Sequence, residues 1–269
     1  MMKYGIAALG LGFLAGFAHA DGDYASPTDD RIRVSLGAIF TSSSTTLQVD
    51  SSTGLPGTVI SGENQFGLDS SDVEPKFQVM VRAGDRNRLR FDYFTLDRSG
   101  NATVAEPIVF RDAVLQPGDP LQSLLNLRLF TLTYGYSFWR SEKLEIAATL
   151  GITAVDISSQ AKVQTDAVHI NQLETAAGPY PTPGIDATWV ASKRFYFDGR
   201  VQYLDVHIDH FDGSLGFFEL DALYRFRPNV SFALGYNGVK ANLSSTETGN
   251  TGYFNVSTKG PEFFVRVAF

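Results

Sequence analysis

The chain has 269 residues, which is enough for one large β domain or two small domains. Its formal net charge is −7 and it has no basic block, so nucleic acid is not expected as a partner. It contains no cysteine, which excludes disulfides and thiolate metal sites.

The first twenty residues have the order of a secretory signal peptide. Lys3 precedes an apolar run over residues 5–17, and the A-H-A sequence at residues 18–20 matches a cleavage site. The run is shorter than the roughly 20 apolar residues that a spanning helix needs. We therefore expect residues 1–20 to be cleaved after export and residues 21–269 to form one β-barrel domain.

The rest of the chain is dominated by alternation of apolar residues with small or polar ones, which is the period of a β-strand. For example, Phe130, Leu132 and Tyr134 alternate with threonine and glycine. No later stretch approaches 18 apolar residues, so no spanning helix is expected. The predicted strands are residues 31–40, 76–84, 88–97, 125–139, 143–156, 184–191, 195–208, 214–226, 230–243 and 252–269.

The connections between these strands alternate between short and long. Tight turns such as residues 84–87 and 227–229 separate longer, more polar segments. Outer-membrane barrels have short turns at the periplasmic end and longer loops at the outer end. The ten residues before the first strand are too few to be expected as a plug. The predicted loops are residues 41–74, 98–123, 157–183, 209–213 and 244–251.

Two features favour a membrane barrel over a soluble β-sandwich, which is the main alternative. The less apolar face of the strands is rich in glycine, alanine, serine and threonine, which suit a narrow lumen. Aromatic residues gather at the strand ends, as they do in the girdles at both membrane boundaries. We predict an all-β fold: a single antiparallel up-and-down transmembrane β-barrel of about ten strands, with eight or twelve as alternatives.

The sequence resembles Gram-negative outer-membrane β-barrel proteins. The resemblance is carried by "LYRFRPNVSFALGYNGVKANL" and "GPEFFVRVAF" near the end, and by "YFTLDRSG" and "LTYGYSF" earlier. In style the chain is similar to the OmpA-like and OmpW-like small barrels of a broad proteobacterial family. The resemblance implies a place in the outer membrane of a Gram-negative bacterium and brings no catalytic motif. We expect no counterpart in this chain of the peptidoglycan-binding domain of full-length OmpA.

Barrels of this kind commonly end in phenylalanine, as this chain does. The resemblance implies that the barrel insertion machinery reads this ending. Alternation places the terminal stripe on the lipid-facing side, with the last ring at the membrane boundary. The predicted C-terminal insertion signal is Phe263, Val265, Val267 and Phe269.

Strand alternation also places charged side chains in the lumen, with equal numbers of each sign. A buried charge without a partner costs several kcal/mol, so balanced numbers indicate mutual pairing. Every basic residue of this set is arginine, whose planar fork suits carboxylate pairing. The alternative is that these charges line a path for small solutes. The predicted lumen ion-pair network is Arg33, Arg82, Arg90, Arg128, Arg200, Arg225, Arg266, Asp92, Glu145, Asp186, Asp198, Glu219, Asp221 and Glu262.

The sequence contains no recognisable catalytic or metal-binding motif. His207 and His210 lie three residues apart, and such residues face opposite sides of a strand. A Ser–His–Asp site stays open as an alternative, because it is recognised by geometry rather than by sequence. Ion pairing explains Glu219 and Asp221, which face the same side, more simply than acid–base work does. We expect no enzyme activity, no cofactor and no metal.

These observations favour a structural or surface-interaction barrel whose long outer loops are the place where ligands dock. The main alternative is a narrow passive or selective channel for small solutes. A lesser alternative is an outer-membrane enzyme that acts on lipid or peptide. The expected partners are outer-membrane lipid, the barrel insertion machinery and an extracellular ligand bound through the loops.

Overall fold

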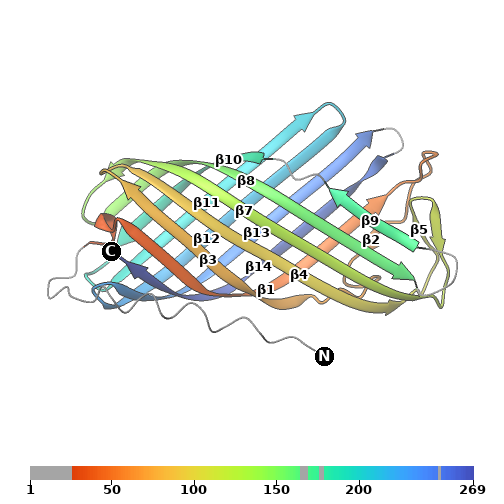
Figure 1. The fold of residues 1–269 in the computed structure, drawn as a ribbon, viewed down its shortest axis with the longest axis horizontal. Helices are drawn as coiled ribbons and strands as arrows, with labels where there is room; N and C mark the ends of the chain where they lie inside the picture. The colour runs from red at the N-terminus through yellow and green to blue at the C-terminus, as the bar shows by residue number, and fades with distance from the viewer. Residues whose placement is uncertain (1–25, 164–168, 176–178, 248–249) are drawn as a thin grey trace.

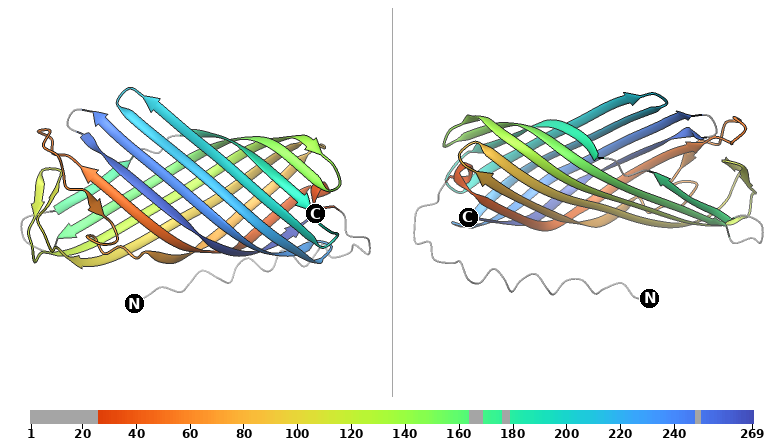
Figure 2. Two further views of the ribbon diagram at one scale, coloured as in Figure 1. Left: turned by 180° about the vertical axis from the view of Figure 1, so that it is seen from behind. Right: turned by 45° about the horizontal axis from the view of Figure 1, so that its top comes forward.

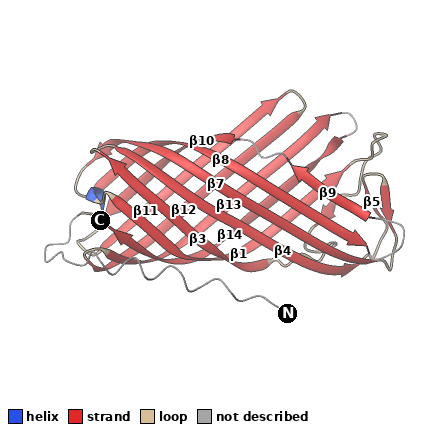
Figure 3. Cartoon of the chain, in the orientation of Figure 1, coloured by secondary structure: helices blue, strands red, loops and turns tan. Residues whose placement is uncertain are grey.

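The structure is a computed structural model, and it describes residues 26–163, 169–175, 179–247 and 250–269. The predicted signal peptide, residues 1–20, lies outside the described residues. In the described part of the chain, no helix is long and apolar enough to cross a bilayer. Strands make up most of this part (Figure 3).

The elements follow one another from a short 3-10 helix to a long C-terminal strand. They are η2 (Pro27–Asp29), β1 (Ile32–Val49), β2 (Ile60–Ser61), β3 (Ser71–Ala83), β4 (Asn87–Thr103), β5 (Ile108–Phe110), β6 (Ala113–Leu115), β7 (Pro120–Arg140), β8 (Leu144–Val163), β9 (His169–Thr175), β10 (Pro179–Val190), β11 (Phe195–Ile208), β12 (Phe211–Arg227), β13 (Val230–Glu247) and β14 (Asn250–Ala268).

The long strands form one antiparallel ring (Figures 1 and 2). The sheet has twelve strands, ordered from β10 through β14 and β1 to β8 and β9, and the pairing of β8 with β10 closes it. β2 lies off this path beside β1. β10 and β9 pair with successive parts of the same edge of β8, so together they fill one position in the wall. The wall therefore has ten strand positions. The prediction of an all-β, up-and-down barrel of about ten strands is confirmed.

The barrel wall separates two kinds of surface. On β7, Leu127 and Leu129 point inward and are 2% exposed, whereas Phe130 and Leu132 point outward and are 42% and 52% exposed. The same alternation is seen on the other wall strands, so large apolar side chains cover the outside of the barrel. An outward apolar band is the mark of a barrel that sits in a bilayer.

The first and last strands meet at the end that carries the short turns. The backbone N–H of Phe269 donates to the carbonyl of Ile32 at 2.9 Å. Phe263 and Phe269 of the terminal stripe lie on the outer face, 48% and 42% exposed, while Phe264 between them points inward and is fully buried. The stripe therefore lies where lipid would contact it, and its role in insertion stays a prediction.

Several strands extend further than predicted at the opposite end. Residues 41–49, 98–103, 157–163 and 179–183 belong to strands, although the sequence favoured loops there. Inward residues such as Thr45 remain buried, while the outward residues beside them are polar. Above the membrane boundary both faces can be polar, so the apolar alternation used for the prediction disappears although the strand continues.

Residues before the first strand pack against the barrel at the short-turn end. Figure 3 shows η2 as a short helix beside the C-terminus. Thr28 is 1% exposed, and its carbonyl accepts a hydrogen bond from Arg140 at 3.1 Å. Asp30 follows and points into the lumen, 3.2 Å from Arg33. The short turn thereby brings the Asp30 carboxylate to Arg33 and Arg225 in the lumen.

Candidate functional site

The half of the lumen nearest the termini is filled by charged side chains, which we name the charged layer. Within the described ranges it holds eight basic and eight acidic residues, drawn from every wall position except β7 and β13. They are Arg33, Lys76, Arg82, Arg88, Arg90, Arg200, Arg225, Arg266, Asp30, Asp92, Glu145, Asp186, Asp198, Glu219, Asp221 and Glu262.

The strongest pair of this layer joins strands that are not neighbours. Both terminal nitrogens of Arg82 on β3 donate to the two carboxylate oxygens of Glu145 on β8, each at 2.8 Å. The Glu145 side chain is fully buried and also contacts the hydroxyl of Ser137. Bidentate arginine–carboxylate pairs add geometric specificity to charge attraction. This pair therefore fixes how two sides of the ring face each other.

A lysine makes a second bridge across the lumen. The ammonium of Lys76 lies 2.8 Å from Glu219 on β12 and 2.7 Å from Glu262 on β14. It also sits 4.2 Å from the centre of the Phe264 ring, where a cation is attracted to the aromatic face. Lys76 thus contacts two buried carboxylates at once and ties β3 to β12 and β14.

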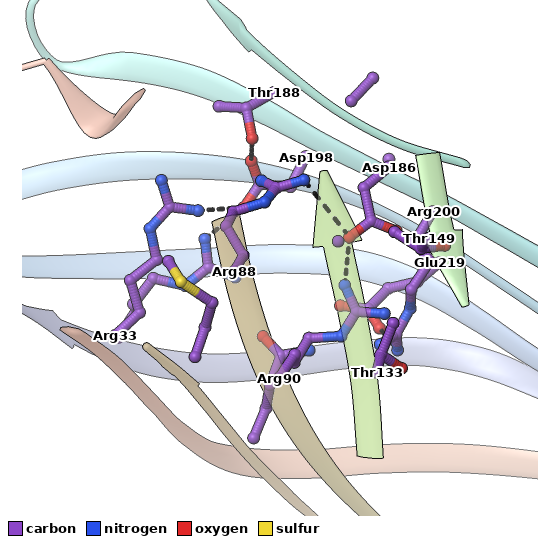
Figure 4. A pocket seen from close by; sticks show the side chains of 16 residues that line it. Arg33, Arg88, Arg90, Thr133, Thr149, Asp186, Thr188, Asp198, Arg200 and Glu219 are labelled. Atoms are coloured by element: carbon purple, nitrogen blue, oxygen red, sulfur yellow. Dashed lines mark hydrogen bonds and ion pairs between the residues drawn. The ribbon is translucent and has the colours of Figure 1, made fainter. Parts of the chain in front are cut away.

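Arginines from β4 and β11 complete the layer (Figure 4). Arg90 contacts Asp186 and lies 2.9 Å from Asp92. Arg200 lies 2.8 Å from the other oxygen of Asp92 and also contacts Glu219. These shared carboxylates make the pairs into one continuous network rather than a set of separate contacts.

The structure places thirteen of the fourteen predicted lumen residues in the charged layer; Arg128 is the exception. Arg128 lies on the outer face and is exposed, because it shares the parity of Phe130 on β7. Sequence reasoning missed Asp30, Lys76 and Arg88. Lys76 and Arg88 follow the inward parity of their strands, so alternation could have found them, whereas Asp30 precedes the first strand and carries no such signal.

A cavity of about 50 Å³ lies within the charged layer (Figure 4). Buried nitrogens of Arg88, Arg90 and Arg200 that border it make no hydrogen bond within the described protein. A polar cavity of this size has room for water, which can satisfy such groups. The charged layer therefore combines direct ion pairs with a small wet space.

Three carboxylates of the layer lie close enough to share a cation. Glu219, Asp221 and Glu262 each offer an oxygen, and these oxygens lie within 4.8 Å of one another. The ammonium of Lys76 already contacts two of them, so the lysine supplies the positive charge that a metal ion would bring. Neither oxygen of the third carboxylate, Asp221, makes a hydrogen bond within the described protein.

The other half of the barrel interior is apolar, which the sequence did not predict. We name it the apolar chamber. Wall residues of β1, β4, β7, β8 and β11–β14 line it, and residues from the segments after β1 and β4 pack into it from the open end. Its buried members include Phe94, Leu96, Leu125, Leu127, Leu129, Val155, Ile157, Leu204, Leu215, Val239, Ala241, Ile60, Phe66, Ile108 and Phe110.

The segment between β2 and β3 is held at this end by a buried arginine. Arg98 on β4 lies 2.6 Å from Glu63 and donates to the carbonyl of Asp69 at 2.7 Å. Burial alone would raise the pKa of Glu63, but the hydrogen bonds from Arg98 and from the backbone of Thr45 hold it below its usual range. The ion pair therefore contributes to the stability of this segment at neutral pH.

The histidines lie away from both halves of the lumen. His207 contacts Asp212 across the β11–β12 hairpin, and both side chains are exposed. His210 is in the turn of the same hairpin, and the side chain of His169 lies outside the described residues. No serine is shown in contact with the His207 imidazole in the described part of the chain, so the pair is not a triad there.

Comparison with known proteins identifies the fold. No protein-family model matches the sequence, and no curated protein is found as a relative. The structure is similar to the outer-membrane protease OmpT from Escherichia coli, with a TM-score of 0.58 and 11% identity over 91% of this chain and 98% of OmpT. By its fold, the chain is an outer-membrane β-barrel of the Gram-negative type.

Two further structures show a weaker likeness, with TM-scores below 0.5. The toluene transporter TodX of Pseudomonas putida has a TM-score of 0.36 and 9% identity, over 89% of this chain and 90% of TodX. OprG from Pseudomonas aeruginosa has a TM-score of 0.29 and 11% identity, over 92% of this chain and 98% of OprG.

The match with OmpT corrects the expectation that the chain is not an enzyme. OmpT is a protease, and it has the same fold along nearly its whole length. A barrel of this architecture therefore accommodates catalysis, and the lack of a sequence motif is no ground for excluding it. At 11% identity the likeness shows the fold alone, so proteolysis is a property of OmpT.

The Arg82–Glu145 pair gives a test of the charged layer. We expect Arg82→Met to lower the free energy of unfolding by about 3–5 kcal/mol, because it leaves a buried carboxylate without its main partner. The double variant Arg82→Met/Glu145→Leu should recover most of this loss. Urea titration of the refolded protein, followed by the mobility of the unheated band on a gel, measures both.

Arg140 provides the matched control for this series. It pairs with Asp29 at 2.7 Å near the surface, with side chains 20% and 58% exposed. Arg140→Met should therefore change stability by only about 0–1 kcal/mol. Equal losses for Arg82→Met and Arg140→Met would show that the lumen is too wet for burial to matter.

The Glu63–Arg98 pair predicts a local pH dependence. Because the pKa of Glu63 is lowered in the folded protein, the pair stabilises the segment above pH 4.5 and is lost as the pH falls through the lowered value. Hydrogen exchange of residues 60–70 should therefore speed up on acidification below that pH. Glu63→Gln should exchange fast at both pH values, and a pH response that persists in this variant would assign the effect to another group.

Proposed function

We propose that the chain is an outer-membrane barrel with a closed lumen, whose interactions take place at the end that carries the long segments. The observation that carries this proposal is the charged layer. Its pairs run between strands on different sides of the ring, as Arg82–Glu145 and Lys76–Glu219 do. A barrel of eight strands is just filled by its own side chains, and ten leave little more room.

The size of the internal spaces supports a closed lumen. The cavity within the charged layer measures about 50 Å³, and the neighbouring one, next to Lys76 and Phe217, about 40 Å³. Each has room for water molecules rather than for a hydrated solute. Opening a path would require several buried ion pairs to separate together, and each such separation leaves charges unpaired.

A narrow channel for small solutes is the second candidate, and one observation favours it. Polar atoms of Arg88, Arg90 and Asp186 at the larger cavity have no hydrogen-bond partner within the described protein. Such atoms could serve an ion or a small polar solute in transit. The closed form is better supported, because all sixteen charges of the layer balance in sign.

The setting of the protein follows from the same proposal. The outward apolar residues would contact outer-membrane lipid, and the stripe that ends at Phe269 would be read by the barrel insertion machinery. The short-turn end would face the periplasm and the long segments would face outward. A ligand would then meet the extended strands and the segments that pack into the apolar chamber.

Conductance in planar bilayers tests the closed lumen. Refolded protein should give no steady, salt-dependent current, because the layer blocks the path. The double variant Lys76→Ala/Arg82→Ala, which removes two bridges, should show leak currents when folded. This result would assign the absence of current in the wild-type protein to the charged layer. Steady conductance of the wild-type protein would support the channel instead.

A further inference from the structure

The barrel wall is split between β10 and β11 at the long-segment end. The ladder between them runs from Val190 with Tyr196 to Gly184 with Gln202, and stops there. Beyond that point residues 179–183 pair only with β8 and residues 203–208 only with β12, within the described ranges. In Figures 1 and 2 the β11–β12 hairpin and β9 diverge above this level.

The cause of the split can be read from the direction of the backbone groups. On β10 the N–H of Val190 donates toward β8, to Lys143, and the N–H of Ala191 donates toward β11, to Phe195. Alternate residues of an antiparallel strand point their N–H groups to the same neighbour, so odd-numbered residues of β10 face β11. Three of them are Pro179, Pro181 and Pro183, which have no N–H to donate.

Two other prolines obey the same rule. On β3 the N–H of Arg82 donates toward β1, so Pro75 has its missing donor on the β4 side, and the β3–β4 ladder ends at Phe77. On β14 the N–H of Ala268 donates toward β13, so Pro261 has its missing donor on the β1 side, where the ladder is interrupted. Proline placement therefore decides where strands of this wall separate.

The split beside Pro75 is closed by hydrogen bonds along its length, whereas among described residues the one beside β10 is bridged at its base alone. At the first, the Glu74 carboxylate accepts from the N–H of Asp97 at 3.1 Å, and the N–H of Asp69 donates to Ser99 at 3.2 Å. At the second, the side-chain amide of Gln202 donates to the carbonyl of Thr182 at 3.4 Å, and beyond this contact no hydrogen bond joins residues 179–183 to residues 203–208 in the described part of the chain.

Behind the split lies a crevice of the apolar chamber with a volume of about 20 Å³. Tyr180 of β10 and Leu204 of β11 stand at its two sides. Nearly all of its lining is apolar, and the polar exceptions are the Tyr180 ring hydroxyl and Ser214. The lining consists of Val155, Ile157, Tyr180, Leu204, Val206, Gly213, Ser214, Leu215, Ala241 and Leu243.

The split opens at the level of the membrane boundary. On the outer face of β11, Val201 and Tyr203 are 58% and 54% exposed, and the next outward residues are Asp205 and His207. An aromatic residue followed by charged ones marks the passage from lipid to water. Because the carbonyl of Phe195 accepts from β10, the N–H groups of odd residues of β11 face β10, and those of Tyr203, Asp205 and His207 have no strand partner there among the described residues.

From these observations we propose that the split admits the alkyl chain of an amphiphile from the outer membrane boundary into the apolar crevice. As it stands the crevice has room for about one water molecule, so the chain would have to displace the Tyr180 ring in order to lie against Leu204. The polar head would stay at the boundary and accept hydrogen bonds from the N–H groups of β11. This inference rests on the proposed outer-membrane setting and does not depend on the closed lumen.

Closing the split tests the route. In the folded full-length barrel held in an amphipathic polymer, cis-parinaric acid should bind with a rise in its fluorescence. Pro181→Val/Pro183→Val restores two N–H donors that face β11, extends the ladder and should weaken this binding at least about tenfold. Pro261→Val restores a donor elsewhere in the wall and should leave binding unchanged.

A second variant tests the crevice independently of the wall. Ala241→Leu adds volume to a lining residue that is 4% exposed, and should weaken binding while the split stays open. Equal affinity of wild type and Pro181→Val/Pro183→Val in folded barrels would overturn the route, and absence of binding to wild type would overturn the proposal. A barrel that conducts and still binds the probe would refute only the closed lumen.

A second experiment, in vesicles, identifies the source of the alkyl chain. In vesicles with a chain-spin-labelled phosphatidylcholine, an immobilised spectral component that Pro181→Val/Pro183→Val removes would show that a membrane lipid supplies the chain. Binding of parinaric acid without that component would show that a free alkyl carboxylate supplies it. An immobilised component of equal size in wild type and the closed-wall variant would contradict entry through the split.

Discussion

Ion pairs that cross the lumen hold the two sides of this barrel in register. Arg82 and Glu145 join β3 to β8, and Lys76 joins β3 to β12 and β14. Ladder hydrogen bonds fix only neighbouring strands, so these contacts are what set the shape of the ring across its width. They also demand balance, because each unpaired charge in this interior would be expensive. The small residues around them leave the room that the long side chains need.

The charged layer explains why the interior changes character along its length. Near the termini the lumen is polar, and beyond the charged layer the inward residues turn apolar around Leu127 and Val155. An apolar interior gives no path to ions, yet it can take up a hydrocarbon chain that enters sideways. The prolines of β10 supply such an entrance by removing N–H donors from one edge while the other edge keeps its ladder.

Alternation in the sequence predicted the architecture, because one face of each strand meets lipid and the other meets the lumen. It also found most of the charged layer, including Arg266 and Glu262. It failed where a strand leaves the membrane and loses its apolar face, as at residues 41–49. The assignment of Arg128 to the lumen is wrong, although alternation with Phe130 places this arginine on the outer face. Asp30 and the apolar chamber depend on how separate segments meet in space. The expectation of no enzyme activity is wrong because it rested on the lack of a sequence motif. The protease OmpT shows that a barrel of this fold can support catalysis.

The access of water-borne reagents to the lumen tests the central claim most directly. The chain has no cysteine, so a single one can be placed without background. Thr133→Cys puts a thiol at a buried position beside the cavity of the charged layer, and Asp85→Cys puts one in an exposed turn at the same end. A charged thiol reagent should modify the Asp85 position rapidly and the Thr133 position more slowly by orders of magnitude. Similar rates at both positions would contradict a lumen closed by ion pairs.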